Sequence, residues 1–280
     1  MPDGLRRVLF DATARLVFAR GGELYELDGS LAELLGAGRQ RLHGAVDRAL
    51  EAEPIDARAQ WLAPVDEQEV WASGVTYRRS ATARVEESSV GDVYEMVYEA
   101  QRPELFLKAP AYRVPRPGAP LRIRADSGWD VPEPELALVL DARAQIVGYL
   151  VADDVSSRSI EGANPLYLPQ AKIYDDSLGL SETIVLARDA GDMTSVAIEL
   201  QIDRGGERVF EATTSTGDMK RTFEELTAAL FAELSHPAGA VLLTGTGIVP
   251  PDEITLADGD RVRVAIEGVG VLEHPIYRNP

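Results

Sequence analysis

The stretch WDVPEPELALVL, residues 129–140, determines most of what can be predicted about the fold. Its apolar part has the length of a buried β-strand, and a turn near residues 141–145 separates it from a second apolar run, Ile146–Val155. Two such strands joined by a short turn form an antiparallel hairpin. Glu133 and Glu135 are two positions apart, so a strand places both carboxylates on the same face.

The pairing register of this hairpin decides which acidic residue faces Glu133. A four-residue turn places Asp154 opposite Glu133, whereas a five-residue turn places Asp153 there. In either register a third carboxylate joins Glu133 and Glu135. Pro134 lacks an N–H group, which indicates an edge or a bulge where such a site is open to a ligand.

Three carboxylates on adjacent strands, without histidine or cysteine, suit a hard divalent cation such as Mg²⁺, Mn²⁺ or Ca²⁺. The alternative is that Glu133 and Glu135 belong to an exposed polar stripe. Both strands are otherwise apolar on both faces, and a strand buried on both sides does not carry charge without a reason. The residues alone leave both interpretations open.

The chain as a whole divides into a small N-terminal α/β domain, residues 1–60, and a β-rich domain, residues 61–280. In the first, a strand hairpin turns at Arg20–Glu23. In the second, short apolar runs alternate with Pro, Gly and Asp clusters, as is typical of sheets. Thr222 and Glu225 form a capping box at the start of a helix. Helical patterns cover residues 31–51, 81–100 (helical or mobile) and 222–235.

Composition excludes several classes of function. The 280 residues include 28 Lys+Arg and 46 Asp+Glu, and the formal net charge of −18 argues against binding to nucleic acid or to anionic membranes. The absence of cysteine excludes thiolate chemistry and cysteine metal sites. No stretch approaches the roughly 20 apolar residues of a membrane span, and the N-terminus lacks the pattern of a secretory signal, so we expect a cytoplasmic protein.

Several short motifs follow one another along the chain. They are WASGVTY (71–77), LFLK (105–108), EPELALVL (133–140), GYLVADDVSSR (148–158), QAKIYD (170–175), TSTGDM (214–219), VLLTGTG (241–247) and DGDRVRVAIEG (258–268). In these motifs and in their order, the sequence resembles the fumarylacetoacetate hydrolase family over about residues 70–275. The resemblance implies a mixed β-roll in an α+β, β-rich fold, a site for Mg²⁺, and a homodimer or homotetramer. It also implies that Glu133, Glu135 and Asp154 are the metal ligands, which favours the four-residue turn.

One departure from the family pattern concerns catalysis. Hydrolases of the family carry a His–Glu pair on a lid, whereas residues 77–87 here contain Glu86 and Glu87 but no histidine. The chain is therefore more similar to the dehydratase branch, which acts on 2-keto-3-deoxy sugar acids such as 2-keto-3-deoxy-D-arabinonate. The resemblance implies a Mg²⁺-dependent lyase that removes water through a metal-stabilised enolate and gives 2,5-dioxopentanoate.

The same resemblance implies roles for individual side chains. Lys172 is the expected base, because a nearby cation disfavours its ammonium form. Glu86 or Glu87 on a closing lid is the expected acid, and Thr246 in the TGTG turn is expected to bind the substrate carboxylate. For Lys108 a structural ion pair competes with a substrate contact. The other expected substrate contacts are Arg78, Ser80, Arg158, Tyr167 and Gln170.

Three other functions stay open. The first is hydrolysis of acylpyruvates or similar diketo acids, with Glu86 or Glu87 activating water. The second is decarboxylation of oxaloacetate, which uses the same metal and enolate. The third is metal binding without catalysis. In each catalytic case the expected partner is a small 2-keto acid.

Overall fold

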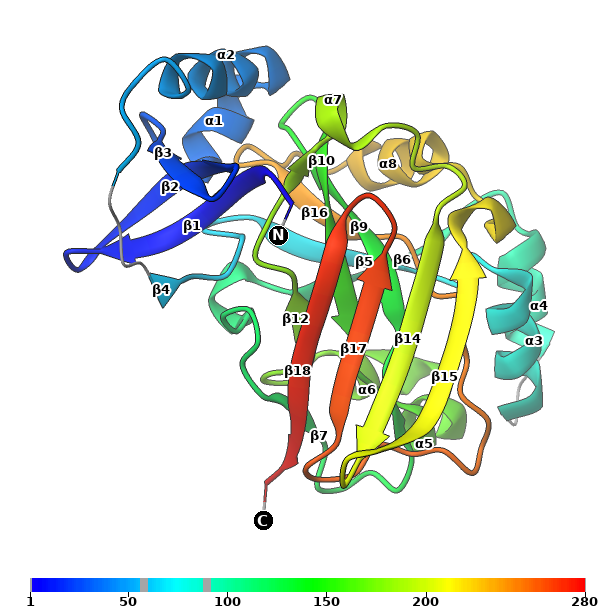
Figure 1. Cartoon of the computed structure of the whole chain (residues 1–280). Coiled ribbons are helices and arrows are strands. Elements are labelled where there is room, and N and C mark those ends of the chain that lie inside the picture. Colours follow the sequence, from blue (N-terminus) through cyan, green and yellow to red (C-terminus); the bar gives the residue numbers. More distant parts are fainter. Residues whose placement is uncertain (1, 56–59, 88–91, 280) are drawn as a thin grey trace.

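The predicted hairpin lies in the middle of the largest sheet of the computed structural model, which describes residues 2–55, 60–87 and 92–279 (Figure 1). Strand β9 (Pro134–Leu140) pairs antiparallel with β10 (Ile146–Asp154). The sheet has the order β12-β10-β9-β16-β5-β6, with β13 beside β10, and β16 runs parallel to β5. Its other strands are β5 (Glu69–Gly74), β6 (Glu104–Ala109), β12 (Leu178–Leu180), β13 (Val185–Leu186) and β16 (Ala240–Leu243).

A second sheet, in the order β15-β14-β17-β18-β7, packs against one face of the first (Figure 1). Leu136 and Leu138 of β9 share a hydrophobic cluster with Leu200 and Val264 of this second sheet. Its strands are β7 (Leu121–Ile123), β14 (Ala197–Arg204), β15 (Glu207–Ser215), β17 (Arg261–Ile266) and β18 (Gly270–Arg278). A short ladder beside the sheets joins β8 (Asp130–Val131) and β11 (Ser156–Ser157).

The N-terminal segment covers the other face of β9. Leu5 and Leu35 of this segment share a second hydrophobic cluster with Ala137 and Val139. Both faces of β9 are therefore buried, which explains why its sequence is apolar without alternation. The segment contains β1 (Gly4–Phe10), β2 (Thr13–Arg20), β3 (Glu23–Glu26) and β4 (Gln60–Trp61), in the order β3-β2-β1-β4, with α1 (Leu31–Ala37) and α2 (Arg39–Ala49).

The helices follow the sequence pattern with one clear correction. The single helix predicted over residues 31–51 is wrong, because Gly38 has φ +96° and separates α1 from α2. The capping box of Thr222 and Glu225 is confirmed at the start of α8. The other helices are α3 (Arg78–Glu87), α4 (Asp92–Glu99), α5 (Arg158–Ala163), α6 (Leu168–Lys172), α7 (Ala187–Ala190) and α8 (Phe223–Phe231), with 3₁₀ turns at Ala111–Arg113, Pro165–Tyr167 and Thr216–Asp218. None of the described helices is long and apolar enough to cross a membrane.

Asp154 lies opposite Glu133, as predicted, but the turn that leads to this pairing is not the predicted one. Leu140 pairs with Ile146, so the turn contains five residues, 141–145, and the four-residue turn is wrong. A bulge at Val147 then shifts the pairing by one residue, and Gly148 pairs with Val139. The shifted register continues to the end of β10, where it brings the two strands together at the acidic residues.

Candidate active site

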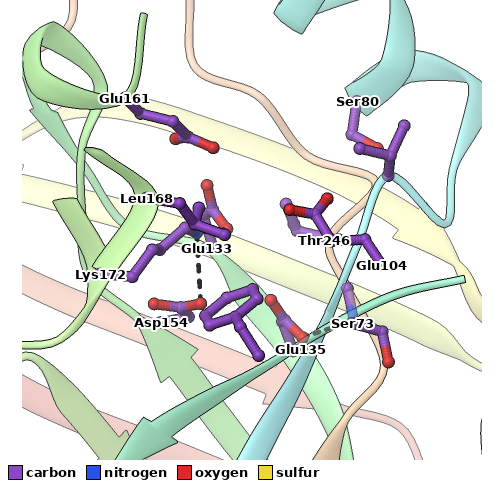
Figure 2. A pocket seen from close by; sticks show the side chains of 14 residues that line it. Ser73, Ser80, Glu104, Glu133, Glu135, Asp154, Glu161, Leu168, Lys172 and Thr246 are labelled. Carbon is purple, nitrogen blue, oxygen red and sulfur yellow. Dashed lines mark hydrogen bonds and ion pairs between the residues drawn. The ribbon is translucent and has the colours of Figure 1, made fainter. Parts of the chain in front are cut away.

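Three buried carboxylates meet in the pocket shown in Figure 2. Glu133 directly precedes β9, Glu135 is its second residue, and Asp154 ends β10. One oxygen atom of each carboxylate lies within 4.8 Å of the others, and the three residues are 4%, 1% and 1% exposed. The backbone N–H of Asp154 donates to the carbonyl of Glu133 at 3.0 Å. The bulged register therefore places the third carboxylate beside the predicted pair.

Basic side chains approach these acids from three directions. Lys172, at the end of α6, places Nζ 2.5 Å from Glu133 Oε2 and 3.2 Å from Asp154 Oδ2. Nη2 of Arg158 lies 2.9 Å from Glu133 Oε1. Lys108 Nζ lies 2.5 Å from Asp154 Oδ1. Lys172 thus bridges two of the three acids.

Lys108 lies beneath the site and is not among the residues that line the pocket. Its ammonium group donates to the carbonyls of Lys172 at 2.5 Å and Val155 at 3.2 Å, in addition to its ion pair with Asp154. Burial lowers the pKa of Lys108, and the negative charge of Asp154 opposes this effect. These contacts hold the end of α6, where Lys172 is located, against β10.

Glu135 is the acid in the least favourable surroundings. Its Oε2 accepts a hydrogen bond of 2.5 Å from the backbone N–H of Gly245. Burial, followed by the nearby charges of Asp154 and Glu133, raises the pKa of Glu135 well above its ordinary value. A divalent cation between the three carboxylates would remove this penalty. A buried donor set of carboxylate oxygens at this spacing fits Mg²⁺ or Mn²⁺.

The TGTG turn, residues 244–247, forms one wall of the pocket. Gly245 has φ +89°, and a Cβ atom there would lie 2.0 Å from Oγ1 of Thr76, so only glycine fits. This glycine brings its N–H group to Glu135, and Thr246 follows with its side chain on the pocket wall. The other lining side chains are Ser73, Val75, Ser80, Glu104, Phe106, Glu161, Leu168 and Lys172.

Residues 69–277 match the family model described as fumarylacetoacetate (FAA) hydrolase C-terminal. The chain belongs to the fumarylacetoacetate hydrolase family. The predicted membership and the predicted fold are therefore confirmed.

Its relatives within the family include dehydratases. A probable 2-keto-3-deoxyxylonate dehydratase of Haloferax volcanii is 47% identical over 213 residues, which are 76% of this chain and 73% of that protein. The 2-dehydro-3-deoxy-D-arabinonate dehydratase of Saccharolobus solfataricus is 41% identical over 220 residues, 77% of this chain and 74% of that protein. A solved structure of 2-keto-3-deoxy-D-arabinonate dehydratase complexed with magnesium and 2,5-dioxopentanoate has a TM-score of 0.84 and 32% identity, and the match covers 98% of this chain and 99% of that chain.

In this member of the family, the pocket contains three of the residues predicted for catalysis or substrate binding. Lys172 lies among the acids, and Ser80 and Thr246 lie on the opposite side in Figure 2. The Ser80 hydroxyl donates to the carbonyl of Tyr77 at 2.8 Å. The Thr246 hydroxyl accepts a hydrogen bond from the Ile248 N–H and donates one to the Ile248 carbonyl, both at 3.2 Å. These contacts hold the hydroxyl within its turn.

Other predicted substrate contacts lie outside the pocket lining. Arg78 is on an exposed face of α3, where its guanidinium pairs with Glu95 at 2.9 Å and Glu99 at 3.1 Å. Tyr167 and Gln170 are exposed. Lys108 and Arg158 are buried beside the acids and act on them instead of lining the pocket.

The predicted lid acids, Glu86 and Glu87, are the last two residues of α3. Their side chains lie outside the described residues. The structure therefore does not test whether either one reaches the pocket.

Two pocket acids were missed in the sequence, Glu104 and Glu161. Glu104 begins β6, directly before the LFLK motif. Glu161 is three residues after Arg158 on α5, and it is 3% exposed. The available signal was a carboxylate within or beside a family motif, but a single acid in such a position is common on protein surfaces.

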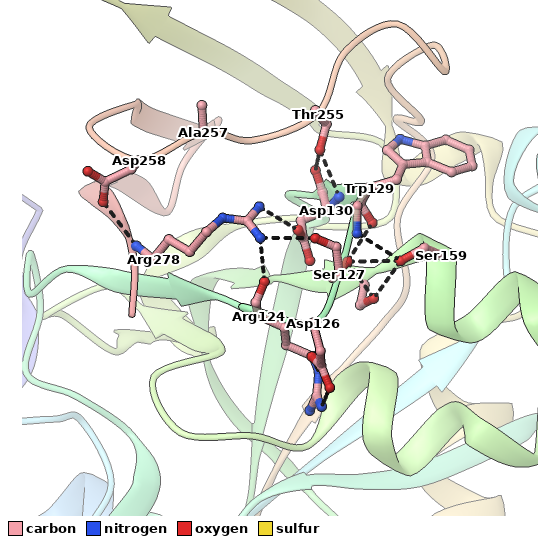
Figure 3. A network of polar contacts seen from close by, with 12 residues as sticks. Arg124, Asp126, Ser127, Trp129, Asp130, Ser159, Thr255, Ala257, Asp258 and Arg278 are labelled. Atoms are coloured by element: carbon pink, nitrogen blue, oxygen red, sulfur yellow. Dashed lines mark hydrogen bonds and ion pairs between the residues drawn. The ribbon is translucent and has the colours of Figure 1, made fainter. Parts of the chain in front are cut away.

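A polar network holds the segment that leads into Glu133 (Figure 3). Arg278, near the end of β18, donates to the carbonyls of Arg124 at 2.6 Å and Ser127 at 2.9 Å, and its Nη2 lies 3.2 Å from Asp130 Oδ2. The N–H of Asp130 donates to Oγ1 of Thr255 at 2.9 Å. Only two residues separate Asp130 from Glu133, so the network fixes the direction from which the chain enters the site.

Proposed function

We propose that this protein is a Mg²⁺-dependent dehydratase that converts a 2-keto-3-deoxy pentonate into 2,5-dioxopentanoate. The observation that carries the proposal is the position of Lys172, whose amine contacts two of three clustered carboxylates in a buried pocket. Two relatives, at 47% and 41% identity, are named as dehydratases of such acids. In a pentonate with a keto group at C2 and no hydroxyl at C3, the xylonate and arabinonate skeletons become the same, which reconciles the two names.

Glu133, Glu135 and Asp154 would hold the metal ion. When bound, Mg²⁺ would act as a Lewis acid that draws electrons from the 2-keto group and so acidifies the C3–H bond. The turn at Gly245 orients the Glu135 carboxylate through its N–H group. Arg158 and Lys172 orient the Glu133 carboxylate through ion pairs with their side chains.

Lys172 would accept the proton from C3 at Nζ. A divalent cation beside Nζ disfavours the ammonium form and makes the neutral amine available. The hydrogen bond from Lys108 to the Lys172 carbonyl holds the base close to Glu133 and Asp154. The ring of Phe106, centred 5.9 Å from Nζ, covers the amine on one side and limits its contact with water.

Glu104 would donate a proton to the departing C4 hydroxyl. It lies across the carboxylate cluster from Lys172 in Figure 2. Glu161 also lines the pocket, but its carboxylate is engaged by Arg158, whose Nη1 lies 3.8 Å away. Loss of the C3 proton and the C4 hydroxyl removes one water molecule and leaves a C3=C4 double bond. A proton shift from C5 to C3 then gives an enol with a C4=C5 double bond, and transfer of the enol hydroxyl proton to C4 gives the aldehyde. The lid acids Glu86 and Glu87 stay a prediction.

Thr246 and Ser80 would bind the substrate. Both hydroxyls lie on the pocket wall and are already oriented by backbone groups. A substrate whose carboxylate reaches Thr246 would present C3 to Lys172 from the opposite side.

Measurement of products separates this activity from the alternatives. Purified protein with Mg²⁺ should convert 2-keto-3-deoxy-D-arabinonate to 2,5-dioxopentanoate, detected by chromatography, and EDTA should abolish the conversion. Fumarylpyruvate should not be cleaved, and oxaloacetate should not lose CO₂ above the rate given by Mg²⁺ alone. Faster cleavage or decarboxylation than dehydration would overturn the proposal.

The assembly, location and domain division belong to the same proposal. We infer a homodimer or homotetramer, the assembly that the resemblance to the family implies. The molar mass in solution, measured by light scattering, tests the assembly.

We also propose that the enzyme is cytoplasmic. The N-terminal unit and the catalytic unit divide near residue 60, and the family match of the catalytic unit begins at residue 69.

A further inference from the structure

Asp153 is a second buried acid beside the site, and the proposed chemistry does not use it. It is adjacent to Asp154 on β10, so its side chain leaves the strand on the opposite face. It is 0% exposed and does not line the pocket. A carboxylate removed from water in this way must be compensated by specific partners.

Both oxygen atoms of Asp153 have partners. Oδ1 accepts a hydrogen bond of 2.9 Å from the backbone N–H of Glu133. Oδ2 lies 2.8 Å from Nε2 of His274, which is itself 2% exposed. Because a carboxylate only accepts, Nε2 of His274 carries the hydrogen. The pair thus links β18 of the second sheet to a predicted metal ligand.

The hydrogen bond to Glu133 replaces one that the strand ladder lacks. In a regular antiparallel pair, Glu133 N–H would donate to the carbonyl of Asp154. That carbonyl instead accepts from Ser156 Oγ at 2.9 Å, and the next residue, Pro134, has no N–H group to donate. Asp153 is therefore the acceptor that fixes the Glu133 backbone at the point where the strand begins.

The space for His274 is provided by a glycine on the neighbouring strand. Gly179 of β12 pairs with Asp153. A Cβ atom at Gly179 would lie 3.6 Å from His274 Cδ2, 3.0 Å from Leu121 Cδ1 and 3.1 Å from Leu272 Cδ2. Any larger residue would press on the side chains that hold the imidazole in place.

We infer that His274 and Asp153 are positioning residues that hold Glu133 in the geometry needed to bind the divalent cation. The inference rests on the proposed metal site and deepens it. His274 acts on Asp153, Asp153 fixes the backbone of Glu133, and the Glu133 carboxylate then meets those of Glu135 and Asp154.

Two matched substitutions of His274 test the inference through Mn²⁺ binding, measured by electron paramagnetic resonance without substrate. Gln places a donor N–H where Nε2 of histidine lies, so His274→Gln should bind Mn²⁺ within twofold of the unaltered protein. Asn is equally polar but too short to reach Asp153, so His274→Asn should raise the Kd about tenfold. The control is His236→Asn, which should leave the Kd unchanged. His236 is also buried, and the centroid of its ring lies 4.8 Å from that of Phe231.

Equal Kd values for the Gln and Asn variants, whether normal or weakened, would overturn the inference. Absence of Mn²⁺ binding to the unaltered protein would instead overturn the metal site itself. If His274→Asn does not fold, as judged by its melting curve, Asp153→Asn replaces it. The neutral amide is a weaker acceptor for Glu133 N–H, so a few-fold rise in Kd is expected, and an unchanged Kd would overturn the inference.

Discussion

Two groups of buried acids in this protein differ in how their charge is balanced. Directly before β17 of the second sheet, Asp260 is bound by a single arginine, with Arg204 Nε and Nη2 at 2.7 Å and 2.8 Å from its two oxygens. In the pocket, Glu133 and Asp154 share Lys172, and Glu135 relies on a backbone N–H group. The Asp260 pair is complete, whereas the pocket leaves an acid whose pKa is raised by burial and by its neighbours.

The difference distinguishes a structural ion pair from a binding site. A complete pair of acid and arginine needs nothing further and stabilises the fold when both partners are present. An incomplete set of carboxylates destabilises the chain until a cation enters, so its geometry serves a ligand.

Replacement of the base should have the largest effect. Lys172→Met should lower kcat by about a thousandfold, because Lys172 is the one lysine among the described residues that line the pocket. Lys220→Met is the control, since Lys220 pairs with Glu99 on another part of the surface and should keep near-normal kcat. Retention of a tenth of the activity by Lys172→Met would contradict the assignment.

Removal of one carboxylate should weaken metal binding and strengthen the empty protein. Glu135→Gln should raise the Kd for Mg²⁺ by about 100-fold, measured by calorimetry. In EDTA the same variant should melt at a higher temperature, because one of three neighbouring like charges is gone. A lower melting temperature in EDTA would show that the pocket acids are balanced like the Asp260 pair.

The pH dependence of stability should reveal the raised pKa of Glu135. In the unfolded chain this carboxyl ionises near its ordinary value, but in the folded chain it keeps its proton to higher pH. The stability it contributes is therefore present at low pH and is lost as the pH rises through the raised pKa. Urea unfolding in EDTA should show the free energy of unfolding falling with pH relative to Glu135→Gln, and parallel curves would exclude the effect.

Breaking the complete pair should change stability alone. Asp260→Asn weakens both contacts to Arg204 and should cost about 1–3 kcal/mol in free energy of unfolding. kcat and the Kd for Mg²⁺ should change less than twofold, because Asp260, directly before β17, is not among the residues that line the pocket. A large loss of metal affinity would show that the two groups of acids are coupled.

Much of the fold and of the metal cluster could be predicted from the sequence. The apolar run after Glu135, the turn and the returning strand indicate a hairpin by length and composition, and the capping box at Thr222 depends on neighbouring residues alone. Strands such as β15 and β18 are harder to detect, because charged outward residues and Pro275 interrupt their apolar pattern.

The pocket wall was less predictable, because its residues come from separate elements. Glu104 and Glu161 join the site from β6 and α5, although nothing in their own neighbourhoods marks them. Conversely, Arg78 lies in a suggestive motif, yet its guanidinium pairs with Glu95 and Glu99 on α4. Helix packing decided which way that side chain points.

Glu133 and Glu135 share a face because alternation along a strand is a local property of the backbone, so the order of the residues is enough to predict it. Whether Asp154 or Asp153 completes the cluster depends instead on how the strands pack together, and the structure places Asp154 there. A five-residue turn alone would give the opposite result, and the bulge at Val147 reverses it where Gly148 meets β13. A Cβ at Gly148 would lie 2.6 Å from the Val185 carbonyl, so this register depends on a contact between strands far apart in the chain.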